Sequence, residues 1–580
     1  MGYRILGFSL AHDSSVCVIN DGELEYFGKE ERYSRRKRDK QPFLAIEKAI
    51  ETAKGQIDAV VMQSPTHNQA CSDVIRAFIC KRLPHIDPTN DWIDMTPEHH
   101  LSHATHAYNS SKFDGTALVF VIDRDGSQIW DPEDGKIEVC RDGEGAVKHI
   151  GRECESVYLF KEPVRFRTLH KAFWMENAAF VRSPKHISKG YSSLVQHLRG
   201  KYTCDDIKIK SGYGITKVYE SATTLIGEGP LENGKTMGLA AYGQPTNLPP
   251  LFFGSTPIDQ FFAHEGFVVS TSNTKFNKML ETVTKENYKP YADYAYHVQN
   301  ETQKAVDLLV KKYTHSTGVK NVILTGGYAL NVVTNAYLIK NNPDINFFFE
   351  PNADDTGNSL GAALFVYKLN KQDEKPLEMK DTFYHSLEEQ EPLTIGKTST
   401  PRDIADLIVS RRSVAIYDGQ PEAGPRALGH RSILFDPRGE DARDRVNIIK
   451  KREWYRPFAG IILEEYFEEY FETLGLKSSP SMTVNFEAKQ KAKDECPGII
   501  HVDGTCRMQT VTDGFMCEVL REFHNATGVP VLMNTSFNLA GEALVHTKED
   551  ALQTLDDSML DYVYFVQDDK LVGSLDRKSL

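Results

Sequence analysis

The sequence predicts two domains: an α/β N-terminal domain with two related halves, followed by an α+β C-terminal domain. The chain has 580 residues, more than a single hydrophobic core usually accommodates. Two segments of the N-terminal region are predicted to form hairpins of the same design. A charged stretch, KLNKQDEKPLEMKD, then separates alternating strands and helices from a region of mixed pattern. We therefore place the domains at residues 1–375 and 385–580.

The composition excludes several classes of protein. Hydrophobic residues make up 40% and charged residues 26%, as in ordinary globular proteins, and the net charge of −13 opposes non-specific attraction to nucleic acid. No apolar run approaches the ~20 residues of a membrane span, and the first residues do not have a signal-peptide pattern. The nine cysteines form no CxxC pair, which argues for a reducing compartment. We expect a cytoplasmic protein.

The hairpins predict the two related halves. The first consists of RILGFSL, the polar turn AHDSS, SVCVIN, a turn at Asp21-Gly22 and ELEYFG, and the second of ALVFVID, a turn at residues 124–126 and SQIW. Apolar strands joined by Asp-Gly are a strong hairpin signal. A strand that ends in His or Asp before a tight turn, found twice, is typical of the actin, sugar-kinase and Hsp70 class. Two unrelated hairpins are the alternative.

Later segments fit the same plan. VILTGGYALN predicts a buried strand, a Gly-Gly turn and a helix that begins near Ala329. DDTGNSLGAALFVYKL predicts a turn followed by an apolar helix whose small residues permit close packing. The C-terminal domain begins with RDIADLIVSRRSVAIYDG, a helix and a strand.

Histidines are concentrated in the segment EHHLSHA. In a helix, His99 and His103 lie one turn apart on one face, where both rings can reach the same cation. Acidic residues follow at Asp123 and at Asp354-Asp355. Two imidazoles with carboxylates suit Fe²⁺, Mn²⁺ or Zn²⁺. The alternative is a His-rich helix start whose members hydrogen-bond locally.

Glycine-rich turns predict a nucleotide cleft. Gly326-Gly327 and Asp355-Thr356-Gly357 each precede a predicted helix, where backbone N–H groups can bind phosphate. Glycine is also required for tight turns without any ligand. Lys235, in NGKTMG, is either a phosphate counter-charge or a surface lysine.

The C-terminal domain carries cations at turns and strand ends. Their position favours an anion pocket over surface salt bridges, since the arginine fork matches phosphate and carboxylate oxygens. No GxSxG, Walker A or HExxH motif occurs. The cations are Arg426, Arg431, Lys450, Arg456 and Arg507.

Ten segments in order resemble the O-carbamoyltransferases of nodulation-factor and antibiotic biosynthesis over nearly the whole chain. They are AHDSS, EERYSRRKRD, EHHLSHA, GKTMGLAAYG, GGYALN, DDTGNSLGAA, GPRALGHRSIL, REWYRPFA, HVDGTCRMQT and NTSFNLAGE. The resemblance implies an N-terminal domain of the actin/Hsp70 class, like that of the tRNA threonylcarbamoyl-transfer enzymes, and a YrdC-like C-terminal domain. It also implies that carbamoyl phosphate and ATP, with Mg²⁺, form carbamoyl-adenylate in the C-terminal domain. An acceptor hydroxyl then attacks this intermediate in the N-terminal domain.

The resemblance also implies the site residues. The metal, expected to be iron, falls on His99, His103, Asp123 and Asp355. His12 and Lys37 take the catalytic positions, and His12 either accepts the hydroxyl proton or binds phosphate. The adenylate is expected at Gly326, Gly327 and Asn331. The site for carbamoyl phosphate and ATP falls on Arg426, Lys450, Arg456, Arg507 and Asn534.

The chain departs from the family pattern between Asp123 and GKTMGLA, where the interval is longer and includes a basic insertion at about residues 150–212. Residues 163–201 have eight basic residues against the single acid Glu176. Five aromatic residues are interleaved with them: Phe166, Phe173, Trp174, Phe180 and Tyr191.

Basic and aromatic residues in one segment suit a nucleic-acid groove. We therefore expect a 5-hydroxymethylpyrimidine in DNA as acceptor, contacted by Arg165, Arg167 and Lys171. A helical lid with a solvated charged face is the alternative for the segment, and a small molecule or sugar is the alternative acceptor. A nucleotide-binding regulator and a tRNA threonylcarbamoylation enzyme are less well supported, because both domains carry their sets of site residues in one chain.

Overall fold

The computed structural model describes residues 2–65, 69–130, 149–175, 203–210, 214–248, 250–252, 283–371 and 385–574. The chain forms two compact units. Unit 1 comprises Met1–Tyr26 and Lys40–Lys380, and unit 2 comprises Phe27–Asp39 and Asp381–Leu580. The short segment Phe27–Asp39, which we predicted in the N-terminal domain, makes its contacts in unit 2. There the guanidinium of Arg35 donates to the backbone oxygen of Leu544 at 2.6 Å.

The first sheet of unit 1 has the strand order β3-β2-β1-β4-β5. Its strands are β1 (Arg4–Ser9), β2 (Ser15–Asn20), β3 (Glu23–Lys29), β4 (Ala59–Gln63) and β5 (Trp92–Asp94). β1 is antiparallel to β2 and parallel to β4, which is parallel to β5. Asp21 and Gly22 both have positive φ, 46° and 92°, as a type I′ turn requires. The first predicted hairpin is therefore confirmed.

The second sheet repeats this plan. The path β9-β8-β6-β11-β12 matches β3-β2-β1-β4-β5 in order, with β10 added at the edge beside β9. β6 is antiparallel to β8 and parallel to β11, which is parallel to β12, so the three corresponding pairs also agree in direction. The N-terminal domain is thus a duplicated α/β domain of the actin/Hsp70 class. The strands are β6 (Ala117–Ile122), β7 (Gln128–Trp130), β8 (His149–Glu162), β9 (Arg165–Met175), β10 (Cys204–Lys210), β11 (Asn321–Thr325) and β12 (Asn346–Phe349).

The second predicted hairpin is wrong in its pairing. β7 does not pair with β6. Both strands pair with the 14-residue strand β8, which is long enough to pair with β6 along one part and with β7 along another. Ile122 of β6 faces Glu155, and Gln128 of β7 faces Arg152. The helical lid is also wrong for residues 149–175, which form β8 and β9. In the second sheet, β8 and β9 occupy the positions that β2 and β3 occupy in the first sheet.

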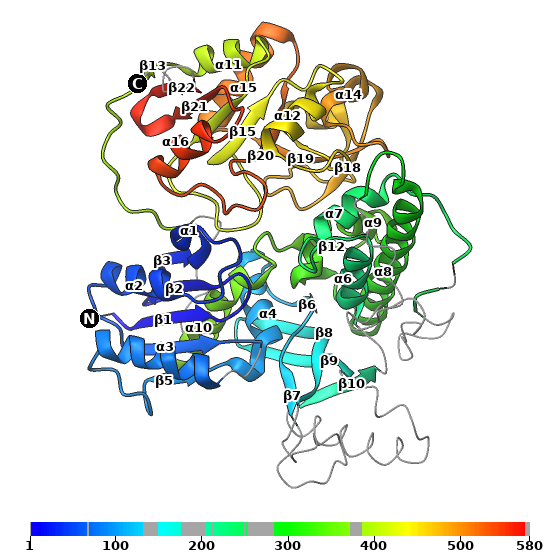
Figure 1. Ribbon diagram of the computed structural model, residues 1–580. Coiled ribbons are helices and arrows are strands. Elements are labelled where there is room, and N and C mark those ends of the chain that lie inside the picture. Colours follow the sequence, from blue (N-terminus) through cyan, green and yellow to red (C-terminus); the bar gives the residue numbers. More distant parts are fainter. Residues whose placement is uncertain are drawn as a thin grey trace. The chain divides into compact units, whose positions relative to one another are not determined.

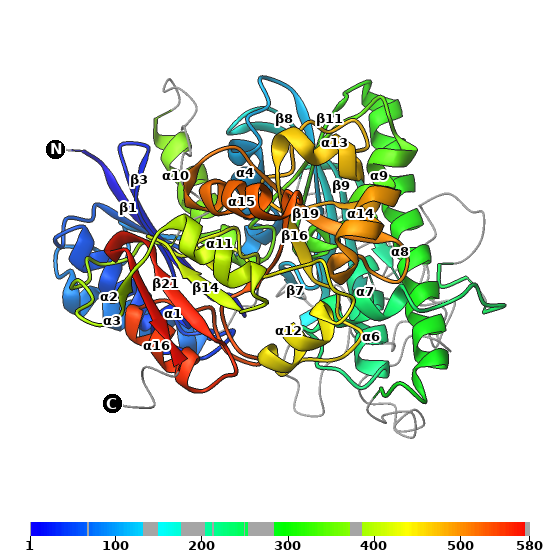
Figure 2. The same ribbon diagram turned by 90° about the horizontal axis from the view of Figure 1, so that it is seen from above.

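Two helices lie between the sheets of unit 1 (Figures 1 and 2). α10 packs on β1, β2 and β4, α4 packs on β6 and β11, and the two helices pack on each other. A Cβ on Gly361 of α10 would lie 1.8 Å from the backbone oxygen of Ser102 in α4. The small residues predicted in this helix thus permit backbone contact. Among the described residues of unit 1, the helices are α2 (Phe43–Thr52), α3 (Gln69–Arg82), η1 (Thr96–Glu98), α4 (His99–Ser110), α6 (Ile215–Leu225), α7 (Asn233–Ala240), α8 (Tyr288–Thr317), η5 (Gly327–Leu330), α9 (Val332–Asn341), η6 (Asp355–Gly357) and α10 (Asn358–Asn370).

The Gly-Gly turn leads into a 3₁₀ turn, so the α-helix begins at Val332 and not near Ala329. Gly326 has φ 83° and ψ 160°, which takes the chain out of the strand. The side chain of Asn331 then caps α9 by accepting from the N–H of Thr334 at 3.0 Å.

Unit 2 has a ten-stranded mixed sheet of order β13-β22-β21-β14-β15-β20-β16-β19-β18-β17. Parallel pairs such as β16–β19 occur beside antiparallel ones such as β16–β20, which confirms the α+β class. Its strands are β13 (Lys397–Thr398), β14 (Val414–Tyr417), β15 (Arg431–Phe435), β16 (Ala459–Leu463), β17 (Phe471–Glu472), β18 (Asn485–Ala488), β19 (Thr505–Val511), β20 (Val531–Ser536), β21 (Tyr562–Phe565) and β22 (Lys570–Gly573). Its helices are α1 (Glu30–Ser34), α11 (Pro401–Val409), α12 (Ala442–Lys450), η7 (Glu464–Tyr466), α13 (Phe467–Tyr470), α14 (Gln490–Glu495), η8 (Pro497–Ile499), α15 (Gly514–Thr527), α16 (Lys548–Asp556) and η9 (Val566–Asp568).

Within the described parts of the chain, no helix has the length and apolar character needed to cross a bilayer.

Candidate metal centre and anion site

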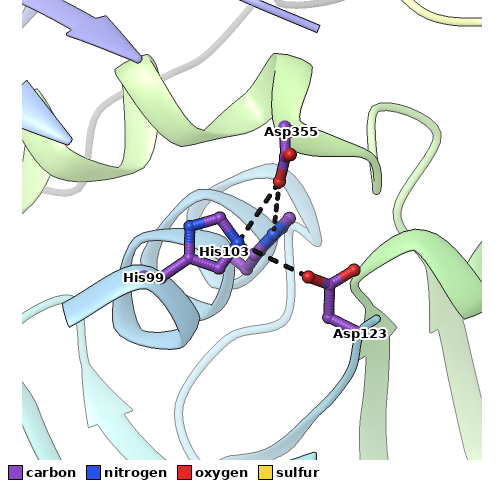
Figure 3. Close-up of side chains that lie close together, drawn as sticks. All are labelled: His99, His103, Asp123 and Asp355. Atoms are coloured by element: carbon purple, nitrogen blue, oxygen red, sulfur yellow. Dashed lines mark ion pairs between the residues drawn. The ribbon is translucent and has the colours of Figure 1, made fainter. Parts of the chain in front are cut away.

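Four side chains from three elements of unit 1 meet in one buried cluster (Figure 3). His99 and His103 lie one turn apart on α4, Asp123 follows β6, and Asp355 begins η6. One ligand atom from each lies within 4.8 Å of the others. Nε2 of His99 is 3.4 Å from Asp123 and 3.3 Å from Asp355. Nε2 of His103 is 3.3 Å from Asp355. The structure thus brings together all four expected ligands.

The cluster fits a divalent metal. Nε2 of His99 is buried and makes no hydrogen bond, although it faces two carboxylates. A buried nitrogen that lacks a hydrogen bond is unfavourable unless a ligand binds it. Two imidazole nitrogens and two carboxylate oxygens are suitable donors for Fe²⁺, Mn²⁺ or Zn²⁺.

The electrostatics distinguish these residues from other buried histidines. Burial disfavours the charged imidazole, but Asp355 and Asp123 outweigh burial and raise the pKa of His99 to about 10. Burial opposes ionisation of Asp123, yet His99 and His103 hold its pKa well below the usual range. By contrast, burial lowers the pKa of His106, on the same helix, to about 3. The cluster therefore attracts positive charge to the point between its carboxylates.

Further residues hold the ligands in place. The amide of Gln63, at the end of β4, lies 2.7 Å from Nδ1 of His99. Asn358 donates to Asp355 at 3.0 Å, and its amide nitrogen is 3.1 Å from Nε2 of His103. We did not predict either residue. For Asn358 the signal was available, because it lies in the quoted segment DDTGNS. For Gln63 the sequence contains no such signal.

His12 lies beside the cluster. It follows β1, pairs with Asp13, and its Nε2 is 3.4 Å from the second oxygen of Asp355. Burial opposes its charge, but Asp13 and Asp355 raise the pKa of His12 to about 9. Its side chain is 23% exposed, unlike the fully buried His99, so it can reach a bound molecule.

The Gly-rich turn supports the same cluster. The N–H of Gly327 donates to Asp123 at 3.0 Å, while Asn331 is occupied by its helix cap and by Gln299 at 3.0 Å. Lys235 forms an ion pair with Glu228 at 2.7 Å. The turn therefore holds Asp123, one of the four expected metal ligands, and the Asn331 amide is already engaged within the protein.

A second cluster, in unit 2, consists of cations. Strand register places Arg507 and Asn534 on either side of Ala459. Burial and the guanidiniums of Arg456 and Arg507 hold the pKa of Arg452 well below its usual range. Burial, together with Arg456, lowers the pKa of Arg507 to about 10.

These three arginines lack adequate counter-charge. Among the described residues, their one ion pair joins Arg456 to Glu453 at 3.5 Å. The Nε atoms of Arg452, Arg456 and Arg507 are all buried without a hydrogen-bond partner. Oxygens of a bound anion would supply both the charge and the acceptors. We did not predict Arg452, although it lies two residues after Lys450 in the quoted segment KKREWYRPFAG.

Comparison with known proteins identifies the family. Residues 86–364 match the family described as Carbamoyltransferase N-terminus, and residues 405–570 match Carbamoyltransferase C-terminus. The chain belongs to the carbamoyltransferase family. Nodulation protein NolNO of Sinorhizobium fredii is 27% identical over 94% of this carbamoyltransferase and 76% of that protein. Nodulation protein NolO of Bradyrhizobium diazoefficiens is 31% identical over 58% of this chain and 65% of that protein.

Among solved structures, full-length HypF in its phosphate- and nucleotide-bound form is similar to this carbamoyltransferase. It is 13% identical over 63% of this chain and 55% of that chain, with a TM-score of 0.36.

Other predicted anion ligands of the carbamoyltransferase have protein partners. The ammonium of Lys450 donates to the backbone oxygens of Ser536 and Asn538 and to the side-chain oxygen of Asn538 at 2.9 Å. Arg431 is buried, stacks 3.6 Å from the Tyr417 ring and donates to backbone oxygens. Lys450 therefore stabilises the end of β20 and the loop after it, and Arg431 stabilises the segment between β14 and β15.

The remaining predicted residues are spread over unit 2. Asn534 donates to Gln509 at 3.1 Å, and Arg426 is half-buried on the loop before β15. Lys37 belongs to the segment that joins unit 2, where its charge is one cause of the lowered pKa of Lys450 after burial, Arg452 and Arg456. Lys37 is thus placed beside the cation cluster of the carbamoyltransferase.

The expected acceptor residues fall into two groups. Arg165 and Arg167 are 72% and 66% exposed and pair with Glu162 at 3.0 Å and Asp205 at 2.7 Å. Lys171 is only 2% exposed, pairs with Glu153 and donates to Tyr158 at 3.0 Å. The structure corrects its expected role, because a buried ammonium cannot contact an acceptor at the surface.

The aromatic residues of this segment are buried or partly buried where they are described. Phe173 and Trp174 are buried, and Phe166 is partly buried against a core cluster. Phe173 and Trp174 are therefore not available as stacking platforms. Phe180, Tyr191 and the basic residues from 182 to 201 lie outside the described residues.

Proposed function

We propose that the chain is an ATP-dependent O-carbamoyltransferase that works in two steps. Water hydrolyses carbamoyl phosphate to phosphate and carbamate, and a carbamate oxygen then bonds to the α-phosphorus of ATP, with release of pyrophosphate. The resulting carbamoyl-adenylate then passes its carbamoyl group to a hydroxyl, with release of AMP and the hydroxyl proton. The observation that carries this proposal is the presence of two different sites in one carbamoyltransferase, a metal-type cluster in unit 1 and an arginine cluster in unit 2.

The activation step is proposed for the YrdC-like C-terminal unit, with Mg²⁺ bound to ATP. Carbamoyl phosphate and ATP are both highly charged, and three guanidiniums with little counter-charge can neutralise them. Arg452, Arg456 and Arg507 bind the phosphate oxygens. Asn534, Arg426, Lys450 and Lys37 complete the surrounding site, with Lys450 fixing the loop after β20.

The transfer step is proposed for unit 1. His99, His103, Asp123 and Asp355 hold the metal, with Fe²⁺ as the favoured ion, and a bound divalent metal supplies Lewis-acid chemistry. His12 is beside Asp355 and partly exposed, and its raised pKa keeps it protonated near neutral pH, so we assign it to a phosphate oxygen of the adenylate rather than to the acceptor proton. The turn at Gly326 and Gly327 orients Asp123 through the N–H of Gly327, and the adenylate is proposed to bind at this turn.

For the acceptor, the first candidate is a 5-hydroxymethylpyrimidine in DNA. Its support is the excess of basic residues in residues 163–201, of which Arg165 and Arg167 are exposed on β9. The burial of Lys171, Phe173 and Trp174 instead favours a small molecule or sugar. This second candidate therefore belongs in the same test.

The experiment supplies carbamoyl phosphate, ATP, Mg²⁺ and Fe²⁺ with hydroxymethylated DNA, unmodified DNA and hydroxyl-bearing small molecules. Mass spectrometry looks for a product in which carbamoyl replaces hydrogen, and pyrophosphate release is followed in parallel. Carbamoyl transfer without ATP consumption would contradict the two-step proposal. A DNA acceptor further requires affinity that falls steeply with salt, and a smaller salt slope in the Arg165→Ala/Arg167→Ala double variant. Salt-insensitive turnover of a small molecule would support the second candidate.

A further inference from the structure

We infer that Gln63 is a positioning residue of the metal centre. Its side-chain oxygen accepts a hydrogen bond from Nδ1–H of His99 and so keeps Nε2 of His99 free to bind the metal. The inference rests on the metal centre proposed above and names a residue outside the expected ligand set.

The first observation is the contact itself. Nδ1 of His99 lies 2.7 Å from the Gln63 amide, well within hydrogen-bond distance. Both side chains are fully buried, so water cannot replace the contact. In the amide orientation with nitrogen towards His99, the Gln63 oxygen is buried without a hydrogen-bond partner.

The second observation concerns the two ring nitrogens. A neutral imidazole carries one hydrogen, so if Nε2 uses its lone pair for a metal, the hydrogen is on Nδ1. The partner of Nδ1 must then be an acceptor. The nitrogen and oxygen of an amide have nearly the same shape, so rotating the Gln63 amide places its oxygen towards His99 without moving other atoms. Ligating histidines commonly bind an acceptor in this manner.

The third observation is that the backbone makes this contact rigid. Gln63 pairs with Ser9 in the β1–β4 register, and its backbone oxygen accepts from Leu10 at 2.9 Å. At the other side, the N–H of His99 donates to the hydroxyl of Ser127 at 3.1 Å. Both the ring and the main chain of His99 are therefore held. This leaves Nε2 between Asp123 and Asp355.

Gln63 contacts His99, whereas Asn358 contacts His103. Gln63 should therefore affect only one of the two imidazole ligands. The nitrogen facing Asn358 is Nε2, the atom that also faces Asp355, at 3.1 Å and 3.3 Å respectively. A defect in Gln63 should therefore alter one imidazole ligand and leave the other in place. The expected result is weaker metal binding without complete loss.

The test measures Co²⁺ binding to the full-length protein by competition with a chelator, without carbamoyl phosphate or ATP. Gln63→Met keeps the size but removes the acceptor, and we expect its Co²⁺ affinity to fall about tenfold to hundredfold. Gln63→Glu keeps an acceptor, and we expect affinity equal to or above that of the wild type. The matched control is Gln303→Met, because Gln303 is a buried glutamine of the same unit remote from the ligands in sequence. It should bind like the wild type.

Several outcomes overturn the inference. One is a Co²⁺ affinity of Gln63→Met equal to that of the wild type. Another is an equal loss of Co²⁺ affinity in Gln63→Met and Gln63→Glu, which would indicate that Gln63 acts through packing. If Gln63→Met does not fold, Gln63→Glu still decides, because reduced Co²⁺ affinity in a folded Gln63→Glu protein contradicts the inference. Failure of the wild type to bind Co²⁺ overturns the metal centre as well. Normal Co²⁺ results without carbamoyl transfer would instead overturn only the proposed function.

Discussion

The backbone N–H of Gly327 donates a 3.0 Å hydrogen bond to the carboxylate of Asp123. These residues follow neighbouring parallel strands, β6 and β11, whose carboxyl ends lie at the same edge of the sheet. One oxygen of Asp123 is held by this bond, and the other faces Nε2 of His99 at 3.4 Å. This hydrogen bond thus connects the glycine turn directly to the candidate metal cluster.

We expect Gly326→Ala to lower both the stability of the fold and the affinity of the cluster for metal. Gly326 has φ 83°, and a Cβ there would lie 2.5 Å from the backbone oxygen of Ile122. The loss in unfolding free energy should be about 1–3 kcal/mol, with reduced Co²⁺ affinity, because the turn must shift away from Asp123. Urea denaturation provides the measurement. Gly318→Ala is the control, since Gly318 has φ 71° but open space around it. Equal losses in both variants would show that the close contact has no effect.

We expect His99→Ala and His103→Ala to lose bound metal and carbamoyl transfer while keeping the fold. Each removes one of four donors that meet within 4.8 Å. Elemental analysis and circular dichroism give the two readouts. His315→Ala, at an exposed position of α8, should retain full metal content. Full metal occupancy in both ligand variants contradicts the assignment.

We expect Arg452→Met, Arg456→Ala and Arg507→Ala to block formation of carbamoyl-adenylate but to spare transfer from supplied carbamoyl-adenylate. Each loses charge-assisted hydrogen bonds worth roughly 1.5–3 kcal/mol to the anion. In the absence of anions, Arg452→Met should also be more stable than the wild type, because it removes repulsion from Arg456 and Arg507. Pyrophosphate release and thermal unfolding test these statements. Arg521→Ala, at an exposed pair with Glu465, is the control. Equal loss of transfer from the supplied intermediate would argue against two separate sites.

We expect Lys171→Met to destabilise the fold by about 3–5 kcal/mol, because it leaves the buried carboxylate of Glu153 without its ammonium counter-charge. Adding Glu153→Gln should restore much of that loss. Arg165→Met, in an exposed pair, should change the unfolding free energy by less than about 1 kcal/mol. Urea denaturation compares the three proteins. Similar small effects at both positions would mean that Lys171 is not buried in solution.

We expect Glu350→Gln to change the pH dependence of stability. Burial raises the pKa of Glu350 to about 7, from 4.5 for an exposed glutamate. The native carboxyl therefore keeps its proton at pH values where the unfolded one loses it. The native state therefore binds one more proton than the unfolded state between about pH 4.5 and pH 7. The free energy of unfolding of the wild type should be highest below about pH 4.5 and should fall as the pH rises to about 7.

Glu350→Gln stays neutral, so its stability relative to the wild type should increase across the same window by on the order of 2 kcal/mol. Denaturation at several pH values from 4 to 8, roughly spanning both pKa values, gives the comparison. A difference between the two proteins that does not vary with pH would contradict the shifted pKa.

Several features follow from short stretches of sequence. The spacing of His99 and His103 requires only that the segment is helical, because residues four apart share a helix face. The turn at Asp21-Gly22 requires only that these residue types tolerate positive φ. The helix after DDTG begins at Asn358, as its apolar pattern indicates. Such features depend on consecutive residues and backbone stereochemistry.

Other features depend on partners that are distant in the chain, and here the sequence was insufficient. The sequence predicts a hairpin between β6 and β7, but both strands pair with the longer strand β8 instead. The sequence also does not reveal that Gln63 and His99 meet, because β4 and α4 approach only in the folded unit.

The sequence was also insufficient to predict which charged side chains are exposed and which are buried. From the sequence, Arg165, Arg167 and Lys171 are three similar cations on one basic segment. Only the tertiary structure shows that Lys171 meets Glu153 inside the protein while the two arginines remain at the surface. Whether a charged side chain is solvated or buried depends on whether a counter-charge from another strand lies within reach, and that is a property of the fold rather than of neighbouring residues.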